Sequence, residues 1–171
     1  MEQYKRILLK EFDSKQKVIT ELINLEAILN LPKGTELYLS DIHGEFEAFD
    51  YILRTCAGNL NEKINDCFGE DLSKAEKDKL TLLIAYPQEV LSDGFLYPLK
   101  DKSWYGEIIQ NLLTLLTFVA AKYTRSKVRK ALPPQYAYVI EELLYTDRNL
   151  PDSNIYFETI QNYLIDLGEA S

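Results

Sequence analysis

Four consecutive residues, Asp41-Ile42-His43-Gly44, combine side chains that could hold a metal ion. Asp41 and His43 are two positions apart at the end of a short apolar run, so an extended backbone would direct both side chains to the same face. A carboxylate and an imidazole together suit a divalent first-row metal such as manganese, iron or zinc, and Gly44 permits a sharp backbone turn close to a ligand. The alternative is a structural histidine, because an isolated Asp-x-His pair often occurs by chance.

The motif lies between a predicted strand and a predicted helix. Residues 36–40 follow turn chemistry at Pro32–Thr35 and place two leucines on one side, which predicts a strand. After Gly44 the apolar residues recur at helical spacing, so residues 36–58 are expected to form a strand, a tight loop and a helix. Because both edges of a single strand need partners, this strand is expected to pair with a second copy of the chain or, as we favour, with strands of a longer protein.

The rest of the chain is predicted to be helical. Residues 4–31 form one long helix or two shorter ones, with Asp13 and Ser14 able to cap a restart. Ser73 and Glu76 have the spacing of a capping box at a helix start. Further helices are expected at about residues 104–123, 134–145 and 156–167, so residues 59–171 form a helical region. The predicted fold class is mainly α, with one or few β-strands.

Composition and charge exclude several functional classes. The 171 residues are 46% hydrophobic, enough for a sizeable core, and the net charge of −8 disfavours a nucleic-acid binder. The only histidine is His43, so a zinc or two-metal site that needs several imidazoles cannot be complete in this sequence. The N-terminus lacks an apolar signal region, and no apolar run reaches the roughly 20 residues of a membrane span. We therefore expect a cytoplasmic protein that contacts no membrane.

The wider motif resembles a known family. The string Leu39–Phe49, LSDIHGEFEAF, resembles the first metal motif of the calcineurin-like metallophosphoesterases and, in its detail, the class III fructose-1,6-bisphosphatases of bacteria. The amphipathic N-terminus before it and the run Lys122–Pro133 are similar to that family too, so the resemblance spans nearly the whole chain. It implies that residues 1–171 are the N-terminal segment of a longer α/β enzyme, whose fold is a β-sandwich flanked by helices.

The resemblance also implies a reaction and a metal site. In the family, Asp41 and His43 would be the catalytic metal ligands of the first motif, with Mn²⁺ as the expected metal. The later family motifs, of the forms G-D-x-x-D-R-G, G-N-H-E and G-x-H, are absent from this sequence. The implied reaction is hydrolysis of the 1-phosphate of fructose 1,6-bisphosphate to fructose 6-phosphate, a gluconeogenic step, by two-metal activation of water. The 171 residues alone are expected to be inactive, and their partners are expected to be the rest of the polypeptide and, in a homo-oligomer, further copies.

A basic segment interrupts the acidic chain. Such a cluster could bind an anion, either the sugar bisphosphate substrate or a phosphorylated effector. A solvated helix face and intramolecular pairing with Glu141 or Glu142 are the alternatives. The five cations are Lys122, Arg125, Lys127, Arg129 and Lys130.

Two other functions are consistent with the residues. The first is a non-enzymatic helical module that binds or regulates a partner, in which Asp41 and His43 are only structural. The second is another metallophosphoesterase, such as a protein phosphatase. Ser40, where the motif would carry a glycine, and the large helical region make a protein phosphatase less attractive.

Overall fold

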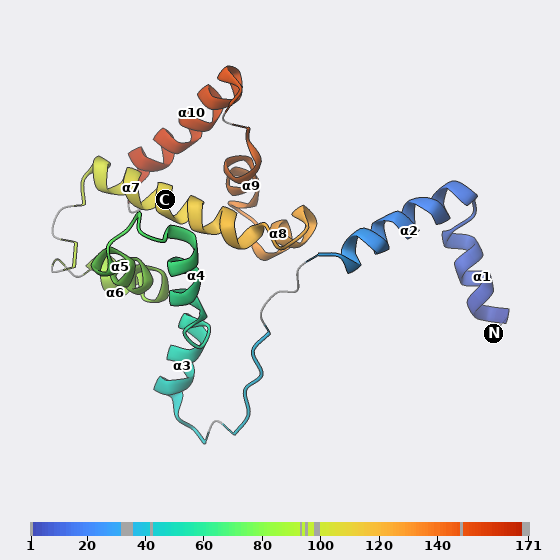
Figure 1. The fold of residues 1–171 in the computed structure, drawn as a ribbon, viewed down its shortest axis with the longest axis horizontal. Helices are drawn as coiled ribbons and strands as arrows, with labels where there is room; N and C mark the ends of the chain where they lie inside the picture. The colour runs from blue at the N-terminus through green and yellow to red at the C-terminus, as the bar shows by residue number, and fades with distance from the viewer. Residues whose placement is uncertain are drawn as a thin grey trace. The chain divides into compact units, whose positions relative to one another are not determined.

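All regular secondary structure in the part of the chain that the structure describes is helical. The computed structural model describes residues 2–31, 36–41, 43–92, 94, 96–97, 100–147 and 149–168. Within these residues the helices, shown in Figure 1, are α1 (Glu2–Glu11), α2 (Lys15–Leu29), α3 (Phe46–Thr55), α4 (Asn59–Phe68), α5 (Lys74–Ala85), α6 (Pro87–Ser92), α7 (Lys102–Ala120), α8 (Arg125–Ala131), α9 (Ala137–Tyr145) and α10 (Pro151–Leu167).

The chain divides into two units, residues 1–34 and residues 35–171. The first unit contains α1 and α2. The hydroxyl of Ser14 accepts a hydrogen bond from the backbone N–H of Lys17 at 3.3 Å and caps α2. The predicted helix restart is therefore confirmed, because a capping side chain satisfies one of the free N–H groups at a helix start. The predicted turn at Pro32–Thr35 lies outside the described residues.

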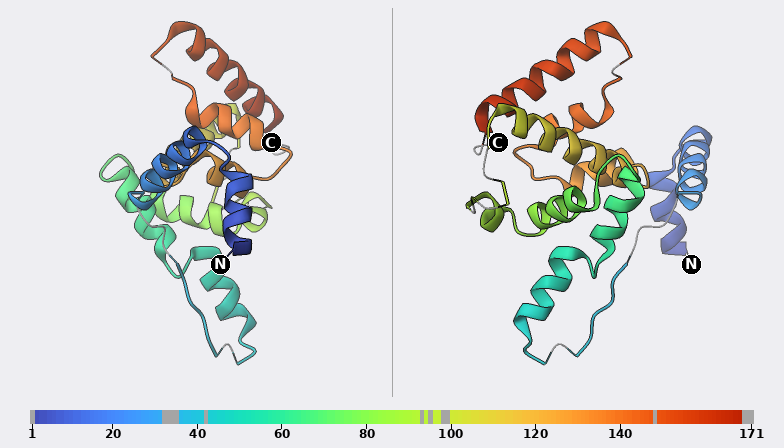
Figure 2. Two further views of the ribbon diagram at one scale, coloured as in Figure 1. Left: turned by 90° about the vertical axis from the view of Figure 1, so that its right-hand side faces the viewer. Right: turned by 60° about the vertical axis from the view of Figure 1, so that its left-hand side comes forward.

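The second unit is built around α7, which contributes to two hydrophobic clusters. In the first cluster, Leu115 of α7 packs with Ile64, Phe68 and Leu80 from α4 and α5. In the second cluster, Leu113 of α7 packs with residues of α9 and α10, namely Leu143 and Phe157. Figure 2 shows α7 between α10 on one side and α5 on the other. The predicted core helix after residue 104 is confirmed by this arrangement.

The helix boundaries follow from local capping chemistry. Ser73 and Glu76 form the predicted capping box, in which the Ser73 hydroxyl accepts from the Glu76 N–H and the Glu76 carboxylate accepts from the Ser73 N–H at 2.7 Å. Asp101 caps α7 by accepting a hydrogen bond from the Trp104 N–H at 2.9 Å. The helices predicted at 134–145 and 156–167 are confirmed as α9 and α10. Among the described residues, no helix combines the length and apolarity that a bilayer span requires.

The prediction of a strand at residues 36–40 is wrong. Residues 36–41 form an irregular, exposed segment, and no strand occurs among the described residues. The expectation of one or few β-strands in these residues is corrected accordingly. The physical reason is that a strand must share its backbone hydrogen bonds with a neighbour, and no described segment supplies them. The alternation of apolar and polar residues is a local signal that carries no information about such a neighbour.

Candidate metal centre

Asp41 and His43 lie on the turn that leads from the irregular segment into α3. Both residues have backbone conformations in the left-handed region, with φ of 60° at Asp41 and 51° at His43. Aspartate and histidine tolerate this region better than bulkier residues, but it still costs on the order of 1 kcal/mol or more per residue. Ile42, between them, lies outside the described residues. Two strained residues in one short turn are typical of functional sites.

The turn brings the two side chains together. The His43 Nε2 atom lies 2.9 Å from the Asp41 Oδ1 atom, and the side chains are 74% and 77% exposed. The sequence predicted that an extended backbone directs both side chains to one face, and the contact between them arises in a different way. An extended backbone is absent, and the left-handed residues of the turn bring the carboxylate and the imidazole into contact instead.

The two side chains fit part of a metal site. A carboxylate oxygen and an imidazole nitrogen in contact are suitable donors for one divalent ion. No group of three or more potential metal ligands occurs among the described residues. Divalent ions usually bind four to six donors, so at least two more would come from elsewhere. Because both side chains are exposed, further ligands have open access to them.

Gly44 completes the turn for conformational reasons. Its φ is +77°, and a Cβ atom added to it would meet no atom within 4 Å. The glycine is therefore required by the left-handed backbone rather than by close packing, whereas the sequence also suggested close approach to a ligand. The Gly44 carbonyl accepts a hydrogen bond from the Phe46 N–H at 2.9 Å, where α3 begins.

Arg54 connects α3, the helix that follows the motif, to the end of α5 within the second unit. Its Nε donates to Asp50 within α3 at 2.7 Å, and its Nη1 donates to the carbonyl of Ala85 at the end of α5 at 2.9 Å. The guanidinium also lies over the ring of Tyr86, 5.0 Å from its centroid. Sequence analysis missed this role, although the Asp50–Arg54 spacing of four residues is a recognisable helix pair.

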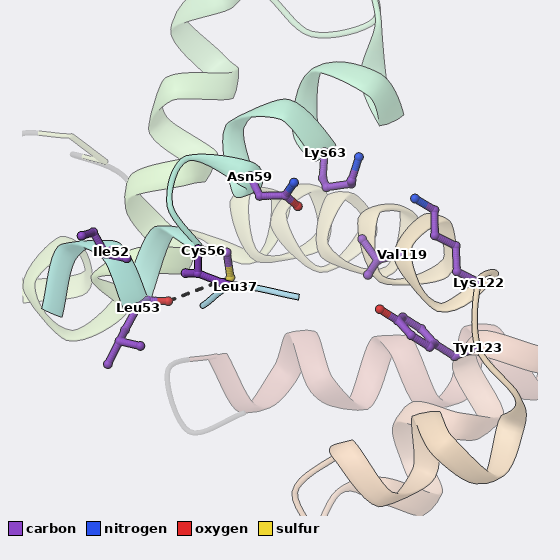
Figure 3. A pocket seen from close by; sticks show the side chains of 9 residues that line it. All are labelled: Leu37, Ile52, Leu53, Cys56, Asn59, Lys63, Val119, Lys122 and Tyr123. Carbon is purple, nitrogen blue, oxygen red and sulfur yellow. Dashed lines mark hydrogen bonds between the residues drawn. The ribbon is translucent and has the colours of Figure 1, made fainter. Parts of the chain in front are cut away.

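A cavity of about 370 Å³ lies beside the start of the irregular segment (Figure 3). Leu37 lines it, four residues before Asp41, together with two cations, Lys63 and Lys122. Lys63 pairs with Asp66 at 3.1 Å, and no described acidic residue pairs with Lys122. The full lining is Leu37, Ile52, Leu53, Cys56, Asn59, Lys63, Val119, Lys122 and Tyr123. Sequence analysis identified Lys122 as part of a basic segment, but it gave no signal that the other lining residues would form a cavity.

Three of the other four predicted anion-binding residues have partners within the chain. The Arg129 Nε donates to Glu141 at 2.5 Å, and this hydrogen bond raises the pKa of Arg129. Arg125 lies over the ring of Tyr145 at 4.3 Å, and Lys127 lies over the ring of Tyr123 at 5.0 Å. Lys130 is exposed in α8. Of the five predicted anion-binding residues, only Lys122 lines the cavity described above. Arg129 instead pairs with Glu141, which is the alternative that the sequence left open.

Comparison with known proteins identifies close relatives of this chain. Residues 3–171 match the family model described as Firmicute fructose-1,6-bisphosphatase. The chain is 68% identical over 170 residues to the class 3 fructose-1,6-bisphosphatase of Streptococcus gordonii, and 69% identical over 170 residues to that of Streptococcus sanguinis. It is 45% identical over 172 residues to that of Staphylococcus haemolyticus. In each case the alignment covers 99% of this chain and 26% of the relative, so the chain spans about a quarter of the length of these curated relatives. No solved structure matches the chain.

Proposed function

We propose, from the premise that this chain belongs to the Firmicute fructose-1,6-bisphosphatase family, that it is the N-terminal segment of an enzyme of gluconeogenesis. The enzyme hydrolyses the 1-phosphate of fructose 1,6-bisphosphate to give fructose 6-phosphate. The observation that carries this proposal is the family match over residues 3–171. The names of the relatives support a sugar bisphosphatase over a protein phosphatase or a non-enzymatic helical module.

In this proposal, Asp41 and His43 are catalytic residues that hold one of two divalent cations, expected to be Mn²⁺. The contact between the Asp41 carboxylate and the His43 imidazole supports this role, because one ion can bind both donors where they already lie together. When bound, such cations neutralise charge on the phosphoryl oxygens and make an attacking water more acidic. The remaining ligands belong to the polypeptide outside these 171 residues, so the isolated segment is inactive.

The chain's own contribution is to position the two ligands. Left-handed backbone at Asp41, His43 and Gly44 fixes the turn, and Arg54 fixes the helix that follows it. Ligands held on a rigid scaffold lose less conformational freedom when they bind a metal. Substitutions that free the turn should therefore weaken catalysis without touching the substrate.

Anion binding by the basic segment is proposed only where a cavity supports it. Lys122, which has no described acidic partner, lines the cavity beside residue 37, and its ammonium group would attract a phosphate group of the substrate or of an effector (Figure 3). Substituting Lys122 by Ala in the longer enzyme should raise the concentration of substrate or effector needed for half-maximal response. Substituting Arg129, which pairs with Glu141, should leave that concentration unchanged.

A cytoplasmic location accompanies this function. The proposed substrate is a highly charged metabolite that does not cross a membrane unaided, and Cys56 and Cys67 are both free thiols, as in a reducing compartment. Fractionation of the native host cells, followed by assay of each fraction, tests this location directly.

The decisive experiment compares the full-length polypeptide with its variants. With Mn²⁺ and fructose 1,6-bisphosphate, we expect turnover, with ³¹P NMR showing loss of the 1-phosphate and retention of the 6-phosphate. Asp41→Asn and His43→Ala should each abolish turnover, while Asp78→Asn, at an exposed carboxylate of α5 with no described ion pair, should leave it unchanged. Turnover that survives both site substitutions, or release of the 6-phosphate instead, would contradict the proposal.

A further inference from the structure

The first unit contains an apolar groove. Helices α1 and α2 enclose a space of about 340 Å³, and α2 contributes most of its lining. Apart from a single carboxylate, the lining side chains are all apolar. They include Leu9, Phe12, Val18, Leu22 and Leu25, with Glu21 as the carboxylate.

No described residue of the first unit buries this groove. No residue of α2 is buried, and Leu22, at the centre of the lining from α2, is 59% exposed. Isolated helices of 10 and 15 residues are marginally stable in water, and most helical stability in proteins comes from packing of an apolar face. An uncovered apolar groove of this kind marks an interaction surface.

Glu21 specifies the chemistry of the occupant. Its side chain is half-buried among apolar neighbours, and no described residue forms an ion pair or hydrogen bond with it. Covering the groove would remove more water from this carboxylate, which is costly unless a cation or hydrogen-bond donor accompanies the occupant. The occupant is therefore an apolar surface that carries a cation or hydrogen-bond donor opposite Glu21, and lysine or arginine would satisfy the carboxylate with the opposite charge as well.

We infer that the occupant is an amphipathic helix from the same polypeptide, in the part that the proposed function places after residue 171. The inference rests on that proposed function. The alignments leave about three quarters of each relative's length outside the region that this chain matches, so a long polypeptide is available as an intramolecular partner. A tethered segment has a high effective concentration, and closing a longer loop adds little entropic cost. The groove between two helices accepts the apolar face of a third.

Charge does not oppose this docking. Residues 1–34 contain six basic and five acidic side chains, so the unit has too small a net charge to repel an occupant of either sign. Apolar burial and the Glu21 ion pair therefore determine the partner. A helix with lysine or arginine beside its apolar stripe meets both requirements.

Photo-crosslinking of the full-length protein tests the inference. Benzoylphenylalanine replaces Leu22 in the groove or, as a matched control, Leu29, which is on the same helix, is 84% exposed and does not line the groove. Equal amounts of ¹⁴N-labelled and ¹⁵N-labelled protein are mixed before irradiation, so that links between copies produce mixed-isotope peptides. We expect position 22 to link to peptides beyond residue 171 in single-isotope pairs, at least tenfold more than position 29.

Three results would overturn the inference. Mixed-isotope pairs from position 22 would show that a second copy fills the groove. Links confined to residues 36–168 would identify the rest of this chain as the occupant. Yields from position 22 that are no greater than those from position 29 would show that the groove has no occupant.

A second measurement does not depend on the crosslinker. In the full-length protein, Leu22→Gln should increase amide hydrogen exchange across residues 4–29 by at least tenfold, while Leu29→Gln should change it less than twofold. Equal effects of the two substitutions would contradict the inference. Neither measurement uses substrate or metal, so a protein that forms the predicted links but does not hydrolyse fructose 1,6-bisphosphate refutes only the proposed function. An active enzyme without those links refutes only the docking.

Discussion

Substitution of Arg54 by Ala should loosen α3 while leaving the rest of the second unit folded. Arg54 is the clearest polar anchor between α3 and α5, since its guanidinium donates to the Ala85 carbonyl and lies over the Tyr86 ring. Of the residues of α3, only Thr55 is buried. A helix with so little buried surface depends strongly on such an anchor, and this helix directly follows the proposed metal ligands.

The expected loss of stability can be worked out from the three contacts. A hydrogen bond from a charged donor contributes about 1.5 kcal/mol, and the low end of the range applies because the Arg54 side chain is about a third exposed. The pair with Asp50, four residues away, adds about 0.4 kcal/mol. The cation–π contact adds about 0.5 kcal/mol at an exposed position. Arg54→Ala should therefore cost about 2 kcal/mol, and Arg54→Lys, which keeps the charge without the planar fork, about 1 kcal/mol.

Native-state hydrogen exchange measures this loss for α3 separately from global unfolding. A cost of about 2 kcal/mol corresponds to exchange about 30-fold faster in residues 46–55, and about 1 kcal/mol to about fivefold. Arg6→Ala, at an arginine of α1 without a described polar contact, is the matched control and should leave exchange in α3 unchanged. Unchanged exchange in Arg54→Ala, or equal effects of the alanine and lysine substitutions, would refute this reasoning.

Three further predictions concern the backbone, the core and pH. Gly44→Ala should lower the free energy of unfolding by about 1 kcal/mol, because alanine is strained at φ +77° although its Cβ has room, whereas Gly94→Ala, where φ is not left-handed, should be neutral in the same urea titration. Ile64→Ala should cost about 3 kcal/mol in urea unfolding, because Ile64 has no exposed surface, and a cost below about 1 kcal/mol would contradict the packing described. Hydrogen bonds with Ser73 lower the pKa of Glu76, so their stabilisation is present above the ordinary glutamate pKa and is lost as pH falls through the lowered value. Glu76→Gln should therefore reduce the loss of thermal stability between neutral and strongly acidic pH, and an unaltered pH dependence would be evidence against that linkage.

Local signals in the sequence predicted most helices correctly. The capping box at Ser73 and Glu76 and the cap at Ser14 depend on side chains within three residues, so sequence spacing alone determines them. The strand prediction at residues 36–40 failed because a strand depends on a neighbouring strand, whose position in the chain or outside it a local pattern does not reveal.

The candidate site was predicted in composition but not in conformation. The residue types at positions 41 and 43 identified a carboxylate and an imidazole that the structure places 2.9 Å apart. Their left-handed backbone was not predicted, because neither residue type requires it. The hydrogen bond between Arg54 and Ala85 joins residues that are 31 positions apart, and helical periodicity predicts only contacts between residues of the same helix.

Manganese binding to the full-length protein tests the central claim most directly. Equilibrium dialysis with Mn²⁺ would compare the natural protein with Asp41→Asn, His43→Ala and the control Asp78→Asn. The account predicts two bound ions per chain, with binding of one of them weakened at least about tenfold by either site substitution and unaffected by the control. Binding of both ions with unchanged affinity in Asp41→Asn and His43→Ala would contradict the assignment of these residues as metal ligands.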